Sequence, residues 1–466
     1  MKMKRRTFSL LTGTSMMALV GPRLRAFAQP ANSDFASLSK TTLTPMGSER
    51  AGNAAGTIPA WTGGMTSIPE GINWDPETEL APDFWADEAP LYVVDSSNMA
   101  QYASVLTEGV QTLIQKKGFS LKVYPTHRTA AAPQWIYDNI VQNSTRAQLN
   151  PAGGRLGFTG GYGGIPFPIP DVSNPLDAGA QIMWNHSTRW DGSEWTATFH
   201  GWNGVGGRVE QAFHSQVWHY SWYDQENGSL DSYKGYSYAE HISLLSPATI
   251  AGTQLISKYA TNPLENPDIA WELLLGQGRV RKAPEIAYDT PSSFVEGLAN
   301  YDEYFGFEGA LDRYDWRFVE KKEMLIPYNN NKMLVSPSET TYIPNFVNPD
   351  VLRWELHRVW VVEATLHPGE RNVLARRMLY VDEDTWTVGV VDSWDGNENI
   401  YKLGMNANCV YPNLPGTILF MPLVYDLQKG DYTATGGPGG EGGVWSFKPS
   451  PMSLFEPEAM AAAASY

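Results

Sequence analysis

The stretch from Arg353 to Trp386 places side chains that could carry chemistry among aliphatic residues. Arginine, glutamate, histidine and aspartate can form ion pairs, transfer protons or bind the headgroup of a ligand. The polar candidates are Arg353, Glu355, His357, Arg376, Arg377, Asp382 and Asp384. Cross-strand ion pairs and turn caps would explain the same residue types, so both interpretations stay open.

Aromatic residues accompany these polar residues at strand-like spacing. The candidates for contact with a ligand are Trp354, Arg358, Trp360, Trp386 and Trp394. Side chains alternate between the two faces of a strand. On a strand from Trp354 to Leu366, the even positions are therefore apolar except for Arg358, and the odd positions form a mixed polar face. An arginine on an apolar face is costly unless it is paired or close to a ligand headgroup.

The apolar face has two interpretations. It packs as an ordinary core, or a wide curved sheet leaves enough aromatic surface to line a cavity for an apolar ligand. The chain contains 17 Trp, 23 Tyr and 17 Phe, an unusually heavy aromatic load. Because only two helices are clearly indicated, we favour the cavity.

Familiar catalytic signatures are missing from the sequence after its leader. It has no Gly-x-Ser-x-Gly, no His-Glu-x-x-His and no Cys-x-x-Cys. Three carboxylates lie between Tyr380 and Trp386, and a solvated turn explains them. We therefore expect no catalytic residue, metal or cofactor. A pair of carboxylates could still hydrolyse a glycan, at a separation that the sequence does not provide.

Short turns rich in Asp, Asn, Gly or Pro divide the C-terminal part into an antiparallel meander. Its predicted strands cover residues 354–366, 373–382, 386–394 and 400–405. Further strands are predicted from Gln181 onward, with a hairpin turn at Asp191-Gly192.

Two helices and one loop are predicted before these strands. Apolar residues at helical spacing indicate a first helix from Ser96 to Ile114 and a second from Pro133 to about Gln148. The segment from Gly154 to Pro170 is rich in glycine and proline but lacks the Gly-Lys-Ser/Thr of a phosphate-binding loop. We interpret it as a rigid extended flap or lid.

The N-terminus has the pattern of an export signal. A basic start, an apolar run from Phe8 to Val20 and a small-residue cleavage motif follow one another. The pair Arg5-Arg6 resembles a twin-arginine signal. We expect cleavage between Ala28 and Gln29. An uncleaved membrane anchor is the alternative, although the apolar run is shorter than the ~20 residues that span a bilayer.

Together with the export signal, the charge and the lack of a later apolar segment predict a soluble, acidic periplasmic protein. The net charge of -16 disfavours nucleic acid as a partner, because phosphate backbones favour clustered Lys and Arg. No segment after the leader is apolar enough for an integral membrane helix. The single cysteine, Cys409, has no partner for an internal disulfide and is expected to be buried. Four regions are expected: an export signal (1–28), an extended arm (29–90), a single curved-sheet domain (91–435) and a glycine-rich loop and tail (436–466).

Several long segments resemble the DUF1329 family of exported bacterial proteins. They include LTPMGSERAGNAAGTIPAWTGG, VYPTHRTAAAPQWIYDN, GQGRVRKAPEIAYDTP and RWELHRVWVVEATLHPGERNVLARRMLYVDEDTW. The resemblance implies a fold similar to periplasmic lipoprotein carriers of the LolA and LolB type. Such a fold is mainly antiparallel β with a few helices, in which helices lid a large curved sheet or incomplete barrel.

The resemblance also implies a function in the cell envelope. The first hypothesis is a carrier or chaperone for a lipid, a lipoprotein acyl chain or another hydrophobic molecule, in trafficking toward the outer membrane. Its implied partner is an inner-membrane transporter of the resistance-nodulation-division type. The alternatives are an envelope hydrolase acting on a glycan or ester, and a structural partner of an envelope transport complex.

Overall fold

The computed structural model describes residues 34–150, 155–226, 228–233, 235–273, 279–282, 288–437 and 445–463. The expected cleavage site at Ala28 and Gln29 lies outside these residues. Within the described ranges, no helix has the length and apolarity needed to cross a membrane.

One large sheet dominates this part of the chain, and its strands pair in the order β1-β2-β14-β15-β16-β17-β18-β19-β5-β6-β7-β8-β9-β10, with β11 on the other edge of β14. Two small sheets, β12-β13 and β3-β4, stand apart from it. The strands are β1 (Tyr92–Val94), β2 (Leu121–Val123), β3 (Gln148–Leu149), β4 (Phe158–Thr159), β5 (Glu194–Val205), β6 (Arg208–His219), β7 (Tyr236–Ser246), β8 (Gln254–Ala260), β9 (Ile269–Leu273), β10 (Val280–Lys282), β11 (Tyr314–Pro327), β12 (Tyr342–Ile343), β13 (Phe346–Val347), β14 (Trp354–Leu366), β15 (Arg376–Asp382), β16 (Val388–Trp394), β17 (Ile400–Tyr411), β18 (Gly416–Asp426) and β19 (Tyr432–Gly437).

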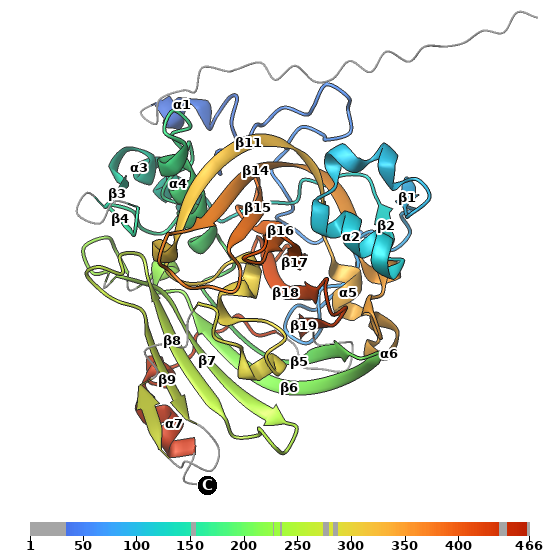
Figure 1. Ribbon diagram of the computed structural model, residues 1–466. Coiled ribbons are helices and arrows are strands. Elements are labelled where there is room, and N and C mark those ends of the chain that lie inside the picture. Colours follow the sequence, from blue (N-terminus) through green and yellow to red (C-terminus); the bar gives the residue numbers. More distant parts are fainter. Residues whose placement is uncertain are drawn as a thin grey trace, which may run out of the picture.

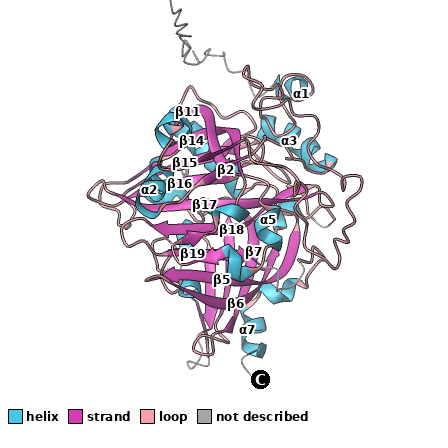
Figure 2. Cartoon of the chain, turned by 90° about the vertical axis from the view of Figure 1, so that its right-hand side faces the viewer, coloured by secondary structure: helices cyan, strands magenta, loops and turns pink. Residues whose placement is uncertain are grey.

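The large sheet curls without closing into a barrel. Figure 1 shows it curving from β11 and β14 through β17 and β18 to β5 and β6, and Figure 2 shows the same strands one above the other. Its pairs are antiparallel except for a single parallel contact between β14 and β2. The prediction of a mainly antiparallel, large curved sheet is confirmed.

A few helices accompany the sheet. They are α1 (Phe35–Leu38), α2 (Glu108–Lys117), α3 (Gln134–Arg146), α4 (Pro175–Ser187), α5 (Asn331–Val335), α6 (Ser338–Thr341) and α7 (Pro457–Ala463). Helix α2 packs on β16 and β17, and α4 packs on β11 and β14. These two helices therefore cover the half of the sheet formed by the meander.

The predicted meander is present as β14 to β17. Strand β14 has the predicted bounds, and its neighbours pair in sequence order. The turn before β17 forms because the Asp395 carboxylate accepts hydrogen bonds from the backbone amides of Asn397 (2.8 Å) and Asn399 (3.0 Å). Cys409 lies on β17 and is buried, as expected.

The first predicted helix is interrupted. Short 3₁₀ turns cover Met99–Gln101 and Ala103–Val105, and α2 begins only at Glu108. The Thr107 hydroxyl accepts a hydrogen bond from the Val110 amide (3.3 Å) and caps the new helix start. Apolar spacing alone did not reveal this cap. The second predicted helix is confirmed as α3.

The strand and hairpin predicted around Gln181 and Asp191-Gly192 are wrong. Residues Pro175–Ser187 form α4, which starts with Pro175 in its first turn and is capped by the Asn174 side chain. The hairpin turn lies instead at Gly206-Gly207, between β5 and β6.

The loop before α4 is not an exposed flap. Its residues from Gly161 to Pro170 are all buried. The Asn143 amide on α3 donates to the carbonyls of Tyr162 (3.1 Å) and Gly164 (3.0 Å), and Asn185 on α4 exchanges hydrogen bonds with the backbone of Phe167. These bonds fix the loop against both helices.

The odd face of β14, predicted to be a mixed polar face, is mostly buried. Glu355, His357 and Val359 are as buried as Trp354. The arm between Leu38 and Tyr92, which has no named helix or strand, contributes to this burial. Its Glu88 carboxylate lies 2.6 Å from the Arg353 guanidinium on the odd face. Its Met46 carbonyl accepts a hydrogen bond from the Trp386 indole (2.9 Å), which stacks on Trp360 of the even face. Both faces of the meander are therefore covered.

Candidate functional site

A row of stacked aromatic rings runs across four adjacent strands, β5 to β8. Ring centroids are 5.0 Å apart between Trp195 and Trp218, 4.8 Å between Trp218 and Tyr238, and 4.6 Å between Tyr238 and Tyr259. Antiparallel pairing aligns Trp195 with Trp218 and Tyr238 with Tyr259, so strand register produces the row. We call these four residues the aromatic row.

The segment from Ser293 to Gly309 lies on this row and fills the inside of the curved sheet. Its 3₁₀ turn at Tyr301–Gly306 contacts β16, β17 and β18, and its turn at Ser293–Val295 contacts β5. The segment therefore touches both halves of the sheet, as its central position in Figure 1 shows. We call residues 293–309 the inner segment.

Phe305 packs its ring against the aromatic row. Its ring meets Trp218 edge to face, with centroids 5.4 Å apart and an interplanar angle of 86°. The Phe305 backbone has φ 54°, a left-handed conformation that is strained for a bulky residue. Packing thus holds Phe305 against its backbone preference.

Two buried ion pairs hold the middle of the inner segment. The Lys402 ammonium lies 2.7 Å from the Glu303 carboxylate, and the Arg377 guanidinium is paired with the Asp302 carboxylate. Arg377 also donates to the Asp302 carbonyl (3.1 Å). The segment is therefore anchored just before the residues that cover the aromatic row.

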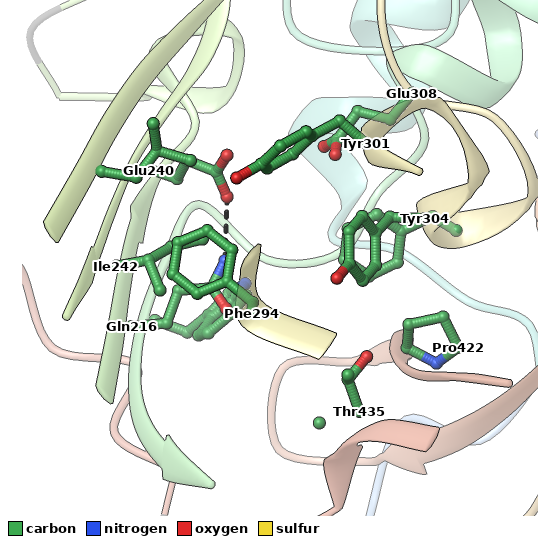
Figure 3. Close-up of a pocket in the computed structure, with 13 residues that line it drawn as sticks. Gln216, Glu240, Ile242, Phe294, Tyr301, Tyr304, Glu308, Pro422 and Thr435 are labelled. Carbon is green, nitrogen blue, oxygen red and sulfur yellow. Dashed lines mark hydrogen bonds between the residues drawn. The ribbon is translucent and has the colours of Figure 1, made fainter. Parts of the chain in front are cut away.

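A small cavity of about 50 Å³ remains between the aromatic row and the inner segment. Figure 3 shows side chains from both sides pointing into it. Its lining residues are Trp195, Gln216, Glu240, Ile242, Leu255, Phe294, Tyr301, Tyr304, Phe305, Glu308, Pro422, Thr435 and Gly436. The lining is aromatic and aliphatic, with two acidic side chains and no basic one.

Glu240 on β7 carries the first of these carboxyl groups. It is 4% exposed. The Gln216 amide donates to its Oε2 (2.9 Å) and the Tyr259 hydroxyl to its Oε1 (3.3 Å). Burial raises the pKa of Glu240 to about 7, although these hydrogen bonds oppose the rise.

Glu308 at the end of the inner segment carries the second carboxyl group. The Tyr238 hydroxyl donates to its Oε1. Burial, and then the nearby Glu240 carboxylate, raise the pKa of Glu308 well above its usual range. Burial therefore favours the uncharged form of both acids, and Glu240 is about half protonated at neutral pH.

A second cavity of about 30 Å³ shares Phe305 and Glu308 with the first. Arg189 is the one basic residue among the described residues that line either cavity. Its Nε lies 2.6 Å from the Asp191 carboxylate, and both side chains are buried. Asp191 therefore neutralises this cation.

The predicted polar residues near the start of β14 form a separate charged cluster. Arg353 pairs with Glu355 (2.5 Å), and His357 lies 3.1 Å from Glu355 and 3.5 Å from Asp382. Burial would lower the pKa of His357, but its bonds to Asp382 and Glu355 raise it to about 9. His357 is therefore a buried cation between two carboxylates.

This cluster includes three side chains that could bind a metal, His357, Asp382 and Asp384. However, the Arg128 guanidinium donates to both Asp384 oxygens, at 2.6 and 2.8 Å. The Arg128 guanidinium therefore occupies the Asp384 carboxylate. The raised pKa of His357 also favours ion pairing over metal ligation, because an imidazole that binds a metal must be neutral.

Arg358 is paired on the opposite face of β14. Its guanidinium lies 3.1 Å from the Glu383 carboxylate and donates to the Ala51 carbonyl (3.1 Å). Lys321 contacts the same carboxylate at 2.5 Å. Arg358 thus has protein partners, and no ligand headgroup is needed to explain its burial.

The remaining candidates are distributed along the meander. Trp360 and Trp386 stack with centroids 5.9 Å apart, and Trp354 is fully buried against Phe119. At the other strand ends the Arg376 guanidinium lies 3.6 Å above the Trp394 ring. None of these residues lines the two cavities described above.

The residues of the cavity are not among the candidates predicted from the sequence. A signal was present at Glu240, which shares its strand face with Tyr238 and Ile242 in the run YSYAEHI. An acid on an apolar face is as unusual as Arg358 on β14. Glu308 offered no such signal, because it follows an irregular segment.

Comparisons with known proteins identify relatives of this chain. The model of the DUF1329 family, described as a protein of unknown function, matches residues 93–461. An uncharacterized protein of Pseudomonas aeruginosa is 32% identical over 441 residues, which cover 93% of each chain.

Two solved structures are similar over part of the fold. A DUF1329 family protein from Desulfovibrio piger has a TM-score of 0.42 at 16% identity, covering 62% of this chain and 99% of that one. A putative outer membrane lipoprotein-sorting protein domain from Vibrio parahaemolyticus has a TM-score of 0.42 at 12% identity, covering 62% of this chain and 100% of that one.

Proposed function

This chain belongs to the DUF1329 family, and from that premise we propose that it is an exported carrier of a hydrophobic molecule in the cell envelope. The ligand lies on the aromatic row, in the place now taken by the inner segment. The export signal (1–28), the arm (29–90), the curved-sheet domain (91–435) and the tail (436–466) are part of the same proposal.

The observation that carries the proposal is the aromatic row, which is covered by a segment outside the sheet. Rings on four adjacent strands offer a continuous apolar surface. Exposure of a large apolar surface to water is unfavourable, so this surface needs a cover or a ligand. An irregular segment covers this surface instead of a second sheet. Such a cover can leave without breaking any strand pairing.

The present conformation is the closed state in this proposal. A cavity of about 50 Å³ holds a few water molecules and is far smaller than the several hundred Å³ of a typical ligand site. The inner segment must therefore move before a ligand enters. Strain at Phe305 favours this movement, because a left-handed conformation of a non-glycine residue costs about 1–3 kcal/mol.

Localisation and partners extend the proposal. The leader with its Arg5-Arg6 pair supports export to the periplasm, and the acidic charge supports a partner other than nucleic acid. An inner-membrane transporter of the resistance-nodulation-division type would supply the ligand. Co-purification of that transporter with the tagged protein tests this step.

A hydrolase is the second candidate, because two carboxyl groups line one aromatic cavity. Glycoside hydrolysis needs one protonated acid and one ionised carboxylate, so the two pKa values must be pushed apart. Burial raises both the pKa of Glu240 and that of Glu308, which favours the carrier. Turnover of glycoside substrates by the wild type, lost in Glu240→Gln, would favour the hydrolase instead.

Native mass spectrometry of protein purified from the periplasm tests the carrier. The wild type should carry a bound apolar molecule. Ile242→Trp fills the cavity, so this variant should carry no bound molecule. Leu245→Trp, at a 45% exposed position on the same strand, should still carry it. A ligand-free wild type with no thermal shift across a panel of lipids would refute the proposal.

A further inference from the structure

We infer that the preferred ligand is a cationic amphiphile, a molecule with an apolar chain and an amine or quaternary ammonium group. This inference rests on the proposed carrier function and names the ligand class of the same site. Its ammonium group is placed between Glu240 and Glu308, and its apolar chain lies along the aromatic row.

The charge of the cavity lining is the first argument. Glu240 and Glu308 are its acidic residues, and none of the described residues that line it is basic. Arg189, beyond Phe305 in the second cavity, is already paired with Asp191. An anionic headgroup would therefore meet two acids and no free cation, whereas a cationic group would meet two partners.

The aromatic walls are the second argument. Figure 3 shows the Tyr301 ring beside the Glu240 carboxyl group, with Phe294 below it and Tyr304 across the cavity. Ring faces attract ammonium groups, and quaternary ammonium ligands are commonly bound by several aromatic side chains together. Acids combined with aromatic walls thus suit a cation better than a neutral apolar molecule.

Protonation of the two acids agrees with this assignment. Burial raises the pKa of both and so favours their uncharged forms. The charged or titratable groups around them are Arg189, Asp268, Tyr238, Tyr259, Tyr301 and Tyr304. A bound cation favours the ionised form of each acid, so binding should release protons.

Three probes with the same ten-carbon chain and different headgroups test the inference: decyltrimethylammonium, 1-decanol and decyl sulfate, each below its micelle concentration. Isothermal titration should show the cationic probe binding at least tenfold more tightly than the others. Titration in two buffers of different ionisation enthalpy should show proton release with the cationic probe only.

Matched variants locate the effect. Glu240→Gln should reduce the preference for the cationic probe over 1-decanol to less than threefold. Glu308→Gln serves the same purpose if Glu240→Gln does not fold. Glu210→Gln, at an exposed acid on β6, should retain the preference.

The outcomes separate the inference from the proposed function. Equal binding of all three probes would overturn the cationic preference and leave the carrier intact. Tighter binding of decyl sulfate would also overturn it. Binding of none of them, together with a ligand-free native mass, would overturn both.

Discussion

Removal of the Phe305 ring is the sharpest test of the closed state. The ring covers Trp218 and is partly buried. Truncating a fully buried Phe to Ala costs about 3–5 kcal/mol. Because Phe305 is only partly buried, we expect Phe305→Ala to lower the free energy of unfolding by about 2 kcal/mol.

The same loss should strengthen ligand binding. The ring and the ligand compete for Trp218, so the energy that holds the segment closed opposes binding. If about 2 kcal/mol of that energy is lost, affinity for an apolar probe rises by up to about 30-fold, since 1.4 kcal/mol corresponds to a factor of ten. Isothermal titration with 1-decanol measures this change, and urea unfolding measures the stability.

Phe305→Gly is the matched variant. It removes the ring and also relieves the left-handed backbone at φ 54°, which costs a non-glycine residue about 1 kcal/mol or more. Phe305→Gly should therefore be more stable than Phe305→Ala, the reverse of the usual order. Weaker binding in both variants would refute the competition between the ring and the ligand. A Phe305→Ala variant more stable than Phe305→Gly would refute the backbone strain.

Three further predictions concern the ion pairs. The pKa of His357 is raised to about 9, against about 6.5 for an unperturbed histidine. The protonated side chain therefore stabilises the fold below pH 6.5, and this contribution of up to about 3 kcal/mol is lost as the pH rises through about 9. Unfolding by urea across pH 6–9.5 should show that decline, and His357→Gln should flatten it. Arg128→Met leaves Asp384 buried without its partner and should cost about 3–5 kcal/mol, measured by thermal unfolding. An unchanged midpoint would contradict this assignment. Arg377→Met frees Asp302 and should speed hydrogen exchange at residues 301–309 more than in β14, whereas uniform exchange would argue against an anchor.

Much of the meander could be predicted because its signals are local. The strand from Trp354 to Leu366 was predicted with its observed bounds, since alternating residues and turn sequences act over a few positions. The helix predicted from Ser96 to Ile114 is interrupted before Glu108, and this interruption was not predicted. The helix at Pro175–Ser187 was not predicted either. In both cases the capping side chains, Thr107 and Asn174, decide where the helix begins.

The polar candidates show a similar division. Of the polar candidates, the fold brings Arg353, Glu355, His357, Asp382 and Asp384 into one cluster, whereas Arg376 and Arg377 lie elsewhere. The sequence did not indicate that Arg128, which comes from a distant segment, pairs with Asp384. The solvated turn predicted for Asp382, Glu383 and Asp384 is wrong, because all three are buried and Glu383 pairs with Arg358. Arg358 was correctly marked as unusual, and its partner Glu383 explains it.

The sequence by itself determined the strands, their antiparallel order in the meander and the alternation of their faces, because these depend on neighbouring residues. Only the tertiary structure decided where the cavity lies. Trp195, Trp218, Tyr238 and Tyr259 become one surface through strand register, and Glu308 reaches Glu240 only because the inner segment folds into the curve of the sheet. Contacts between residues so far apart depend on the whole packing of the chain, which no local pattern encodes.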